Sequence, residues 1–434
     1  MLGSLINIAA LSTGLYAAET QPISWVKDDW QAAKTQALKH NKLIAVDVWA
    51  TWCHTCLAMK NFVFTEPKFS DVESKHVWLA LDYDRPKNAD FFRKYSINAF
   101  PTFMLIDPAT DRVVSRWLGS GTAEEMRQFF SLTKSDISDE SSDVMFKIQR
   151  ALSDKKYNAA IELLERNLKS EKDTARKTRL LSAYAEALRK TDPVGCATKN
   201  EEFLDQVSNN AQGLDYVMLV SYCAGSVKEA SDKTRILTKI AQRLVGGLQS
   251  KDLDISVDDH STVLSALSDL YAQLGKASLA HRTKVQQMTL LEKAASNAGS
   301  QKKRSTFDAH RFSCYLSLGE FAKAEHMLRE TQNALPKDFN TPWRLALLYR
   351  KMGRFEDGLV AIDRALKLGY GPRRVRLFSA KIDLLVAKND HKSAREVASA
   401  VRAEIATQDK NLIRTFWLNE LESKEKLIQS RAKD

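Results

Sequence analysis

Two of the five cysteines in this 434-residue chain, Cys53 and Cys56, form a Cys-x-x-Cys turn. The turn follows an apolar segment, residues 42–49, and precedes a segment predicted to be helical, so Cys53 stands where a helix begins. Unpaired N–H groups and the helix dipole stabilise an anion there, which lowers the thiol pKa and makes Cys53 a nucleophile. Cys56 is near enough to resolve a mixed disulfide between Cys53 and a substrate. The turn therefore predicts thiol–disulfide exchange in either direction.

One half of a structural zinc site is the main alternative for the turn. Such a site needs four ligands, usually with a second Cys/His pair. The sequence has no second Cys-x-x-Cys, and Cys196, Cys223 and Cys314 are single and distant. We therefore expect no metal, and no cofactor besides the redox-active disulfide. His54 lies inside the ring, where it is either an imidazolium that favours the thiolate or an exposed residue at a helix start.

The segments around the turn predict a small α/β domain. Residues 42–49 and 76–83 are nearly continuous apolar runs of strand length, as expected for strands buried on both faces. Residues 102–106 and 112–117 suit an antiparallel hairpin with a polar turn. Helices are expected at residues 28–40, 57–64, 89–95 and 123–130.

Residues 42–56, KLIAVDVWATWCHTC, resemble the active-site strand and turn of thioredoxins. Residues 98–103, NAFPTF, are similar to the cis-proline loop of that family, and Gly119 also fits its pattern. Residues 64–69, FTEPKF, resemble a feature of the reductant-relay subgroup, which includes the periplasmic C-terminal domain of a membrane thiol-reductant transporter. The resemblance covers about residues 25–130 and implies a thioredoxin-like fold.

The resemblance implies catalytic roles for three residues. Cys53 would be the nucleophile and Cys56 the resolving thiol. Asp47, six residues before Cys53, matches a buried carboxylate of the family, where burial raises the pKa and suits the group to exchange a proton with Cys56. The alternative for Asp47 is a strand-edge carboxylate that faces water.

Substrate contact is implied for the residues that flank the disulfide. Trp52 would shield the site, and Pro101 would be cis, its loop pairing with an extended substrate; an ordinary loop proline is the alternative. His54 and Thr55 complete the ring, and the bulky Phe100 would reshape the contact.

Besides the bulky Phe100, two departures from the family put finer properties in doubt. His54 and Thr55 replace the Gly-Pro of typical thioredoxins, so the redox potential does not carry over. Ala80 stands where thioredoxins often place a lysine near the buried aspartate, so proton handling is expected to differ.

Helical periodicity dominates the chain beyond a polar linker, residues 132–142. The pattern Tyr-x-x-x-Gly-x-Phe occurs at Tyr315 and Tyr349, with Gly319 and Gly353 separated by the 34-residue period of tetratricopeptide repeats. The segment 143–434 therefore resembles a tetratricopeptide-like helical array, most clearly over residues 265–370. Such an array offers a concave surface for a peptide or protein ligand, or else is a helical scaffold with no binding role.

Residues 1–18 form a short apolar run followed by small residues, which predicts a secretory signal peptide; a plain apolar N-terminal helix is the alternative. No other segment is apolar for long enough to cross a bilayer, so the mature chain is expected to have no transmembrane span. The expected organisation is a signal peptide (1–18), a thioredoxin-like domain (20–131), a linker (132–142) and a repeat domain (143–434).

The net charge of +11 lies almost entirely in the repeat segment, where basic and acidic residues are interspersed as on solvated helices. Nucleic-acid binding is therefore not expected. Cys196 and Cys223 are placed to pair on adjacent antiparallel helices in an oxidising compartment, although spacing alone does not establish the bond. Cys314, inside a repeat, is expected to be buried and inert.

The sequence thus favours a thiol–disulfide oxidoreductase, periplasmic or otherwise exported, with a partner-binding repeat domain. The subgroup resemblance favours a reductase of protein disulfides, supplied with electrons by a membrane thiol-reductant transporter or a similar donor. The alternative is a repeat-based adaptor in which the thioredoxin-like domain is mainly a docking module. The sequence leaves reaction direction and substrate open.

Overall fold

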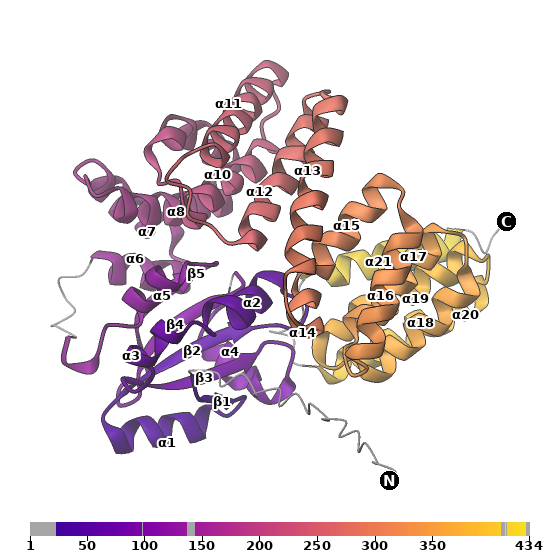
Figure 1. Ribbon diagram of the computed structural model, residues 1–434, viewed down its shortest axis with the longest axis horizontal. Helices are drawn as coiled ribbons and strands as arrows, with labels where there is room; N and C mark the ends of the chain where they lie inside the picture. Colours follow the sequence, from indigo (N-terminus) through magenta and orange to yellow (C-terminus); the bar gives the residue numbers. More distant parts are fainter. Residues whose placement is uncertain (1–22, 98, 137–143, 409–412, 414, 431–434) are drawn as a thin grey trace, which may run out of the picture.

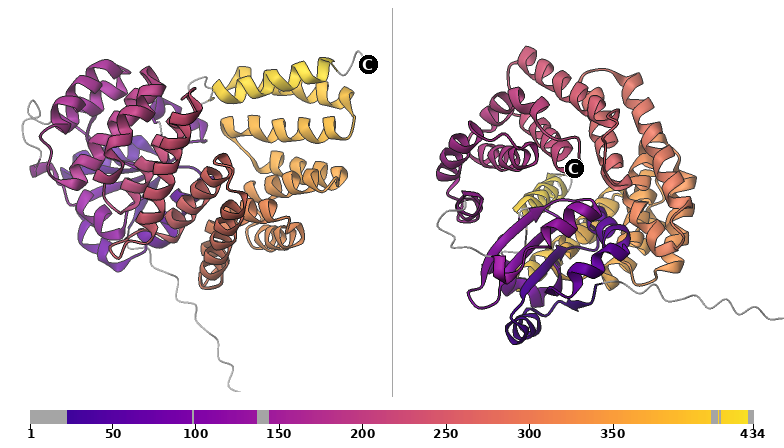
Figure 2. Two further views of the ribbon diagram at one scale, coloured as in Figure 1. Left: turned by 90° about the horizontal axis from the view of Figure 1, so that it is seen from above. Right: turned by 60° about the vertical axis from the view of Figure 1, so that its left-hand side comes forward.

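The computed structural model describes residues 23–97, 99–136, 144–408, 413 and 415–430. Figures 1 and 2 show an α/β domain partly encircled by a long curved array of helices. The expected signal peptide, residues 1–18, and most of the expected linker, residues 132–142, lie outside the described residues.

The α/β domain is built on one sheet with the strand order β1-β3-β2-β4-β5. Strands β1 and β2 run parallel to β3, whereas β4 runs antiparallel to β2 and β5. The three-residue β1 escapes prediction because it is too short to show a hydrophobic period. The strands are β1 (Trp25–Lys27), β2 (Leu43–Trp49), β3 (His76–Asp82), β4 (Thr102–Asp107) and β5 (Arg112–Leu118).

Each face of the sheet carries its own apolar core. Helices α1 and α4 cover one face, and α5 with the segment after the Cys-x-x-Cys turn covers the other. Strand β2 alternates between the two cores and is buried almost throughout, which explains its continuous apolar run. The helices of this domain are α1 (Trp30–His40), α2 (His54–Ala58), α3 (Ser70–Glu73), α4 (Ala89–Lys94) and α5 (Ala123–Phe129).

The expected helix over residues 57–64 is wrong in its detail. The α-helix α2 ends at Ala58 and continues as a wider π turn over Met59–Val63, closed by the N–H of Phe64 donating to the carbonyl of Met59. Met59, Asn61 and Val63 are all buried. Met59 and Val63 pack in the apolar core against the sheet, whereas Asn61 contacts the helical array, so the segment is buried from two sides.

The helical array forms three successive apolar cores, the first over α6–α12, the second mainly over α13–α19 and the third over α19–α21. Its helices are α6 (Val144–Ser153), α7 (Tyr157–Leu168), α8 (Thr174–Thr191), α9 (Pro193–Asn200), α10 (Ala211–Ala224), α11 (Ala230–Leu248), α12 (Val257–Gln273), α13 (Ala277–Ser296), α14 (Gln301–Arg304), α15 (Asp308–Leu318), α16 (Phe321–Ala334), α17 (Asn340–Lys351), α18 (Phe355–Leu368), α19 (Arg374–Ala387), α20 (His391–Thr407) and α21 (Thr415–Ser430).

Gly275 has the same backbone conformation as Gly319 and Gly353, the two repeat glycines recognised in the sequence. Gly275, Gly319 and Gly353 follow α12, α15 and α17 with φ values of 71°, 74° and 74°. The space around each is open, so backbone conformation rather than crowding requires glycine. The sequence pattern therefore marks the turns between stacked helices.

The array and the α/β domain are joined by buried side-chain contacts. The amide of Asn61 donates to the hydroxyl of Thr306 at 2.8 Å, and the Phe62 ring stacks on Phe307 with centroids 5.5 Å apart. Gly371, in the turn before α19, has a φ of 59°, and a Cβ added there would overlap the carbonyl oxygen of Asp84. The two domains thus meet backbone to backbone at this point.

Candidate active site

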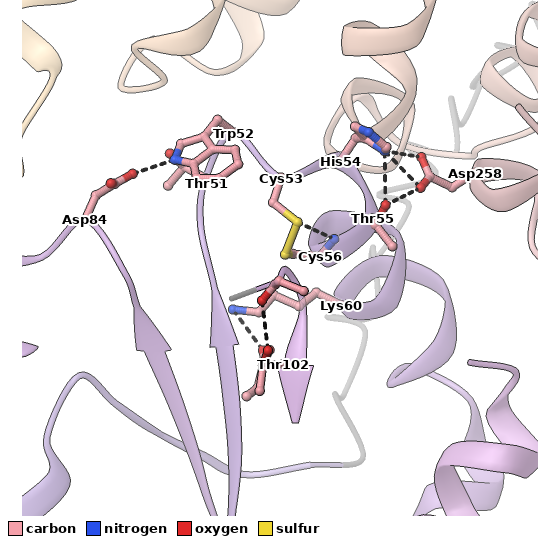
Figure 3. The surroundings of a disulfide bond; sticks show 12 residues. Thr51, Trp52, Cys53, His54, Thr55, Cys56, Lys60, Asp84, Thr102 and Asp258 are labelled. Atoms are coloured by element: carbon pink, nitrogen blue, oxygen red, sulfur yellow. Dashed lines mark hydrogen bonds and ion pairs between the residues drawn. A yellow bond between two sulfur atoms is a disulfide. The ribbon is translucent and has the colours of Figure 1, made fainter. Parts of the chain in front are cut away.

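Strand β2 delivers the Cys-x-x-Cys turn to the start of α2, as the sequence predicts. Cys53 has extended backbone and is the N-cap of α2, and its Sγ accepts a hydrogen bond from the N–H of Cys56 at 3.0 Å. The two cysteines form a disulfide with Cα atoms 5.2 Å apart (Figure 3). Because a thiolate at Cys53 would keep this N–H donor and the helix-start environment, the geometry favours the anionic nucleophile.

The cysteines sit in a small apolar cluster with little exposure. Cys53 is 6% and Cys56 1% exposed, and the rings of Trp52 and Phe100 pack against them. The lower exposure of Cys56 suits a resolving thiol that meets only Cys53.

Asp47 lies on β2 and is 2% exposed, so the alternative of a water-facing strand edge does not hold. Burial raises the pKa of Asp47, and the ammonium of Lys60 opposes that rise without cancelling it. A carboxylate of raised pKa has the property that proton exchange with Cys56 requires.

Lys60 is a site residue that the sequence analysis missed. Its Nζ lies 3.4 Å from Oδ2 of Asp47 and 3.1 Å from the ring centroid of Trp49. Burial lowers the pKa of Lys60 to about 8 in spite of Asp47. Ala80 does pair with Asp47 across β2 and β3, so the ammonium reaches the carboxylate from the turn after α2 instead. The spacing of four residues from Cys56 was the available signal, because it places two side chains on one helix face.

The peptide bond between Phe100 and Pro101 is cis, as the family resemblance implied. Pro101 is buried, and its carbonyl accepts a hydrogen bond from Gly119 at 3.0 Å. The Phe100 ring meets Trp52 edge-on, with centroids 5.3 Å apart, so it does line the approach to the disulfide. Asn98, the first residue of the predicted loop, lies outside the described residues.

Trp52 is held from both domains. Its Nε1 donates to Oδ2 of Asp84 at 2.6 Å, and the guanidinium of Arg373 lies 4.4 Å from its ring centroid. Trp52 therefore lies over the disulfide in a fixed orientation, and an arginine 321 residues later in the chain contributes to it.

The structure places His54 against the helical array, so it is not the exposed helix-start residue of the second alternative. The imidazole is half-buried, and its Nδ1 lies 2.9 Å from both carboxylate oxygens of Asp258, on α12 of the helical array. Thr55 donates to the same carboxylate at 2.9 Å. Burial works against the charged imidazole, but the Asp258 carboxylate outweighs it, so the pKa of His54 is raised. In spite of its own burial, the pKa of Asp258 is lowered by the His54 charge.

His310, on α15, continues this group. Its Nε2 lies 3.0 Å from Nε2 of His54, and its Nδ1 lies 2.7 Å from the hydroxyl of Ser261. Burial and the His54 charge lower the pKa of His310 to about 3. Three residues that could bind a metal, His54, Asp258 and His310, thus bring ligand atoms within 4.8 Å of one another. The two imidazole rings are tilted by 53° with centroids 3.9 Å apart, and their Nε2 atoms lie at hydrogen-bond distance from each other, so we describe the group as hydrogen-bonded.

Comparison with known proteins places the α/β domain in a family. Residues 30–134 match the family model of a thioredoxin-like domain. A thioredoxin H-type protein of Oryza sativa subsp. indica is 32% identical over 93 residues, which are 20% of this chain and 70% of that protein. Through this domain, the chain belongs to the thioredoxin-like family.

Other similarities cover the two parts separately. A thiol:disulfide interchange protein, DsbD, of Pseudoalteromonas atlantica is 28% identical over 82 residues, which span 18% of this chain and 14% of that protein. A tetratricopeptide repeat protein from Parabacteroides merdae is 14% identical, with a TM-score of 0.41, over 64% of this chain and 97% of its own. Within the described residues, no helix is both long enough and apolar enough to span a membrane.

Proposed function

We propose that the chain is a thiol–disulfide oxidoreductase that acts on protein substrates, chiefly as a reductase. The observation that carries this proposal is the Cys53–Cys56 disulfide at the start of α2. It packs against Phe100 of the cis-proline loop and directly follows the strand that contains the buried Asp47. Each of these features has a defined part in the exchange reaction.

In the reducing direction, the Cys53 thiolate attacks one sulfur of a substrate disulfide. The substrate's other sulfur leaves as a thiolate and takes up a proton. Cys56 then gives its proton to the Asp47 carboxylate and attacks the Cys53 sulfur, which releases the second substrate thiolate. The chain ends as the Cys53–Cys56 disulfide, so a separate dithiol must supply two electrons for another cycle.

Three observations support an exported, periplasmic site of action with a membrane electron donor. Residues 1–18 have the pattern of a signal peptide. Cys196 and Cys223 form a second disulfide in the helical array, a bond that persists in oxidising compartments. The catalytic domain is similar to part of the interchange protein DsbD. Cell fractionation with N-terminal sequencing tests this placement; a cytoplasmic, uncleaved protein would contradict it.

Insulin reduction by the full chain, with dithiothreitol as electron donor, tests the exchange activity. We expect wild type to accelerate insulin precipitation and Cys53→Ala to fall to the uncatalysed rate. Equal rates for both would refute the proposal. The equilibrium of the Cys53–Cys56 pair with glutathione then assigns direction, since a potential near −270 mV is typical of a reductant and one near −120 mV of an oxidant.

An adaptor function is the second candidate, favoured by the helical array that makes up nearly two thirds of the chain. Its curved stack offers a surface for a peptide or protein ligand. Capture of a partner that survives Cys53→Ser, but is lost when residues 265–370 are deleted, would favour this candidate. Loss of capture on Cys53→Ser would favour the oxidoreductase.

A further inference from the structure

The helical array contacts the active-site turn residue by residue. Asn340 donates to the carbonyl of Thr51 at 3.3 Å, and Arg373 covers the ring of Trp52 at 4.4 Å. Asp258 accepts from both His54 and Thr55. The array therefore forms one wall of the active site.

Asp258 makes the strongest of these contacts. It is 1% exposed and lies in the first turn of α12, whose N-terminal dipole stabilises a carboxylate. Both of its oxygens are 2.9 Å from Nδ1 of His54. A buried carboxylate needs a cationic partner, and within this contact the partner is the imidazole. Figure 3 shows His54 between Cys53 and Asp258, so the positive end of the pair is the end nearer the sulfur.

A protonated His54 satisfies every ring nitrogen in the group. Its Nδ1–H donates to Asp258, and its Nε2–H donates to Nε2 of a neutral His310. The Nδ1–H of His310 then donates to the hydroxyl of Ser261. The raised pKa of His54 and the lowered pKa of His310 agree with this proton arrangement.

We propose that Asp258 is a positioning residue of the redox site, which orients His54 and retains its positive charge beside Cys53, so that the helical array sets how oxidising the disulfide is. This inference rests on the proposed exchange function. A cation beside Cys53 stabilises its thiolate, which exists only in the reduced state, and therefore shifts the equilibrium toward reduction. The other charged or titratable groups that face His54 are Asp259 on α12, Arg344 on α17 and His310 on α15.

The test measures the equilibrium of the full chain with glutathione in wild type, Asp258→Asn, His54→Ala and the double variant. We expect Asp258→Asn to make the disulfide about tenfold harder to reduce, equivalent to about 30 mV. In the His54→Ala background the same substitution should change the equilibrium by less than about twofold, because the carboxylate acts through the imidazole. The Cys53 thiolate absorbance should show a raised thiol pKa in Asp258→Asn.

Asp308→Asn is the matched control. Asp308 is also 1% exposed and lies in the array, but it accepts from Thr331 and Arg311 instead of the active-site turn. Its substitution should leave the equilibrium unchanged. If Asp258→Asn does not fold, Asp258→Ser removes the same negative charge from beside His54.

The outcomes separate this inference from the proposed function. An active wild type whose equilibrium and thiol pKa do not respond to Asp258→Asn or Asp258→Ser overturns the role of Asp258 and leaves the oxidoreductase standing. An equal shift with and without His54 also overturns it. A wild type without insulin reduction refutes the function itself, whereas the glutathione equilibrium still reports on Asp258.

Discussion

The chain contains the same covalent bond in two different settings. The Cys53–Cys56 disulfide joins residues three apart at a helix start, with His54, Asp47 and Lys60 nearby. The Cys196–Cys223 disulfide joins residues 27 apart, on α9 and α10, inside the first apolar core of the array. Charged and titratable side chains lie near the first bond, whereas the second is packed among apolar side chains, with the Ala185 carbonyl beside Cys196. All four cysteines are buried, so we expect the charge around the sulfur, and not burial, to make the first bond reactive and the second structural.

The largest expected effect is the loss of activity when the Cys53–Cys56 disulfide is removed. Cys53→Ala should abolish insulin reduction because no other thiolate replaces the nucleophile. The double variant Cys196→Ala, Cys223→Ala should keep most of the rate, since those sulfurs are buried away from the turn. Loss of activity in both proteins would mean that the two disulfides act together.

The two disulfides should rank in the opposite order in their contribution to the free energy of unfolding. Chain entropy assigns the Cys196–Cys223 bond about 3–4 kcal/mol and the Cys53–Cys56 bond about 2 kcal/mol, since the first closes the longer loop. Urea unfolding of the Cys196→Ala, Cys223→Ala variant should therefore show the larger loss. The matched variant Cys53→Ala, Cys56→Ala is the control, and an equal or greater loss there would contradict the structural assignment.

Asp47→Asn tests whether Asp47 takes the proton of Cys56. Without a carboxylate to take the Cys56 proton, we expect the resolving step to slow about tenfold or more, measured as accumulation of a trapped mixed disulfide.

The same Asp47→Asn variant should be more stable than wild type at pH 8. The pKa of Asp47 is raised in the folded state, so its unfavourable ionisation costs stability as the pH rises above the ordinary carboxyl value. The gain should vanish near pH 4, and a gain that persists there would contradict a raised pKa.

Lys60→Met should have the smallest effect. Removing the ammonium raises the pKa of Asp47 further and removes a group whose own pKa is about 8. We expect the rate of insulin reduction to fall about threefold at pH 7. Between pH 7 and 9, the rate of the variant should also vary less with pH than the wild-type rate does. Lys68→Met, which removes an exposed lysine from the same domain, is the control and should keep the wild-type pH profile.

The sequence carries the local part of this site and misses its distant part. The strand, the turn and the cis-proline loop are readable because buried strands and cysteine spacing leave contiguous patterns. Lys60 was readable in principle from its spacing to Cys56. Asp258 lies 204 residues from His54, and nothing in the local sequence of α12 distinguishes this carboxylate from an ordinary first-turn aspartate. Only tertiary packing brings the two together.

The repeat segment shows the same division. The repeat pattern at Tyr315 and Tyr349 predicts stacked helices, and the left-handed glycines explain why it recurs. The curvature that returns the array to the Cys-x-x-Cys turn depends on how each helix pair rotates against the next, which no single repeat encodes. The sequence therefore predicted a partner-binding array and missed its contact with the Cys-x-x-Cys turn.

The close approach of Gly371 to the Asp84 carbonyl has a consequence for recognising this arrangement elsewhere. Any side chain at position 371 would separate the backbones of the two domains, and Arg373, two residues later, would move away from Trp52. A glycine at this position in another chain of similar organisation therefore indicates whether its repeats also close over the disulfide. A larger residue at this position would indicate a chain whose repeats do not cover its Cys-x-x-Cys turn.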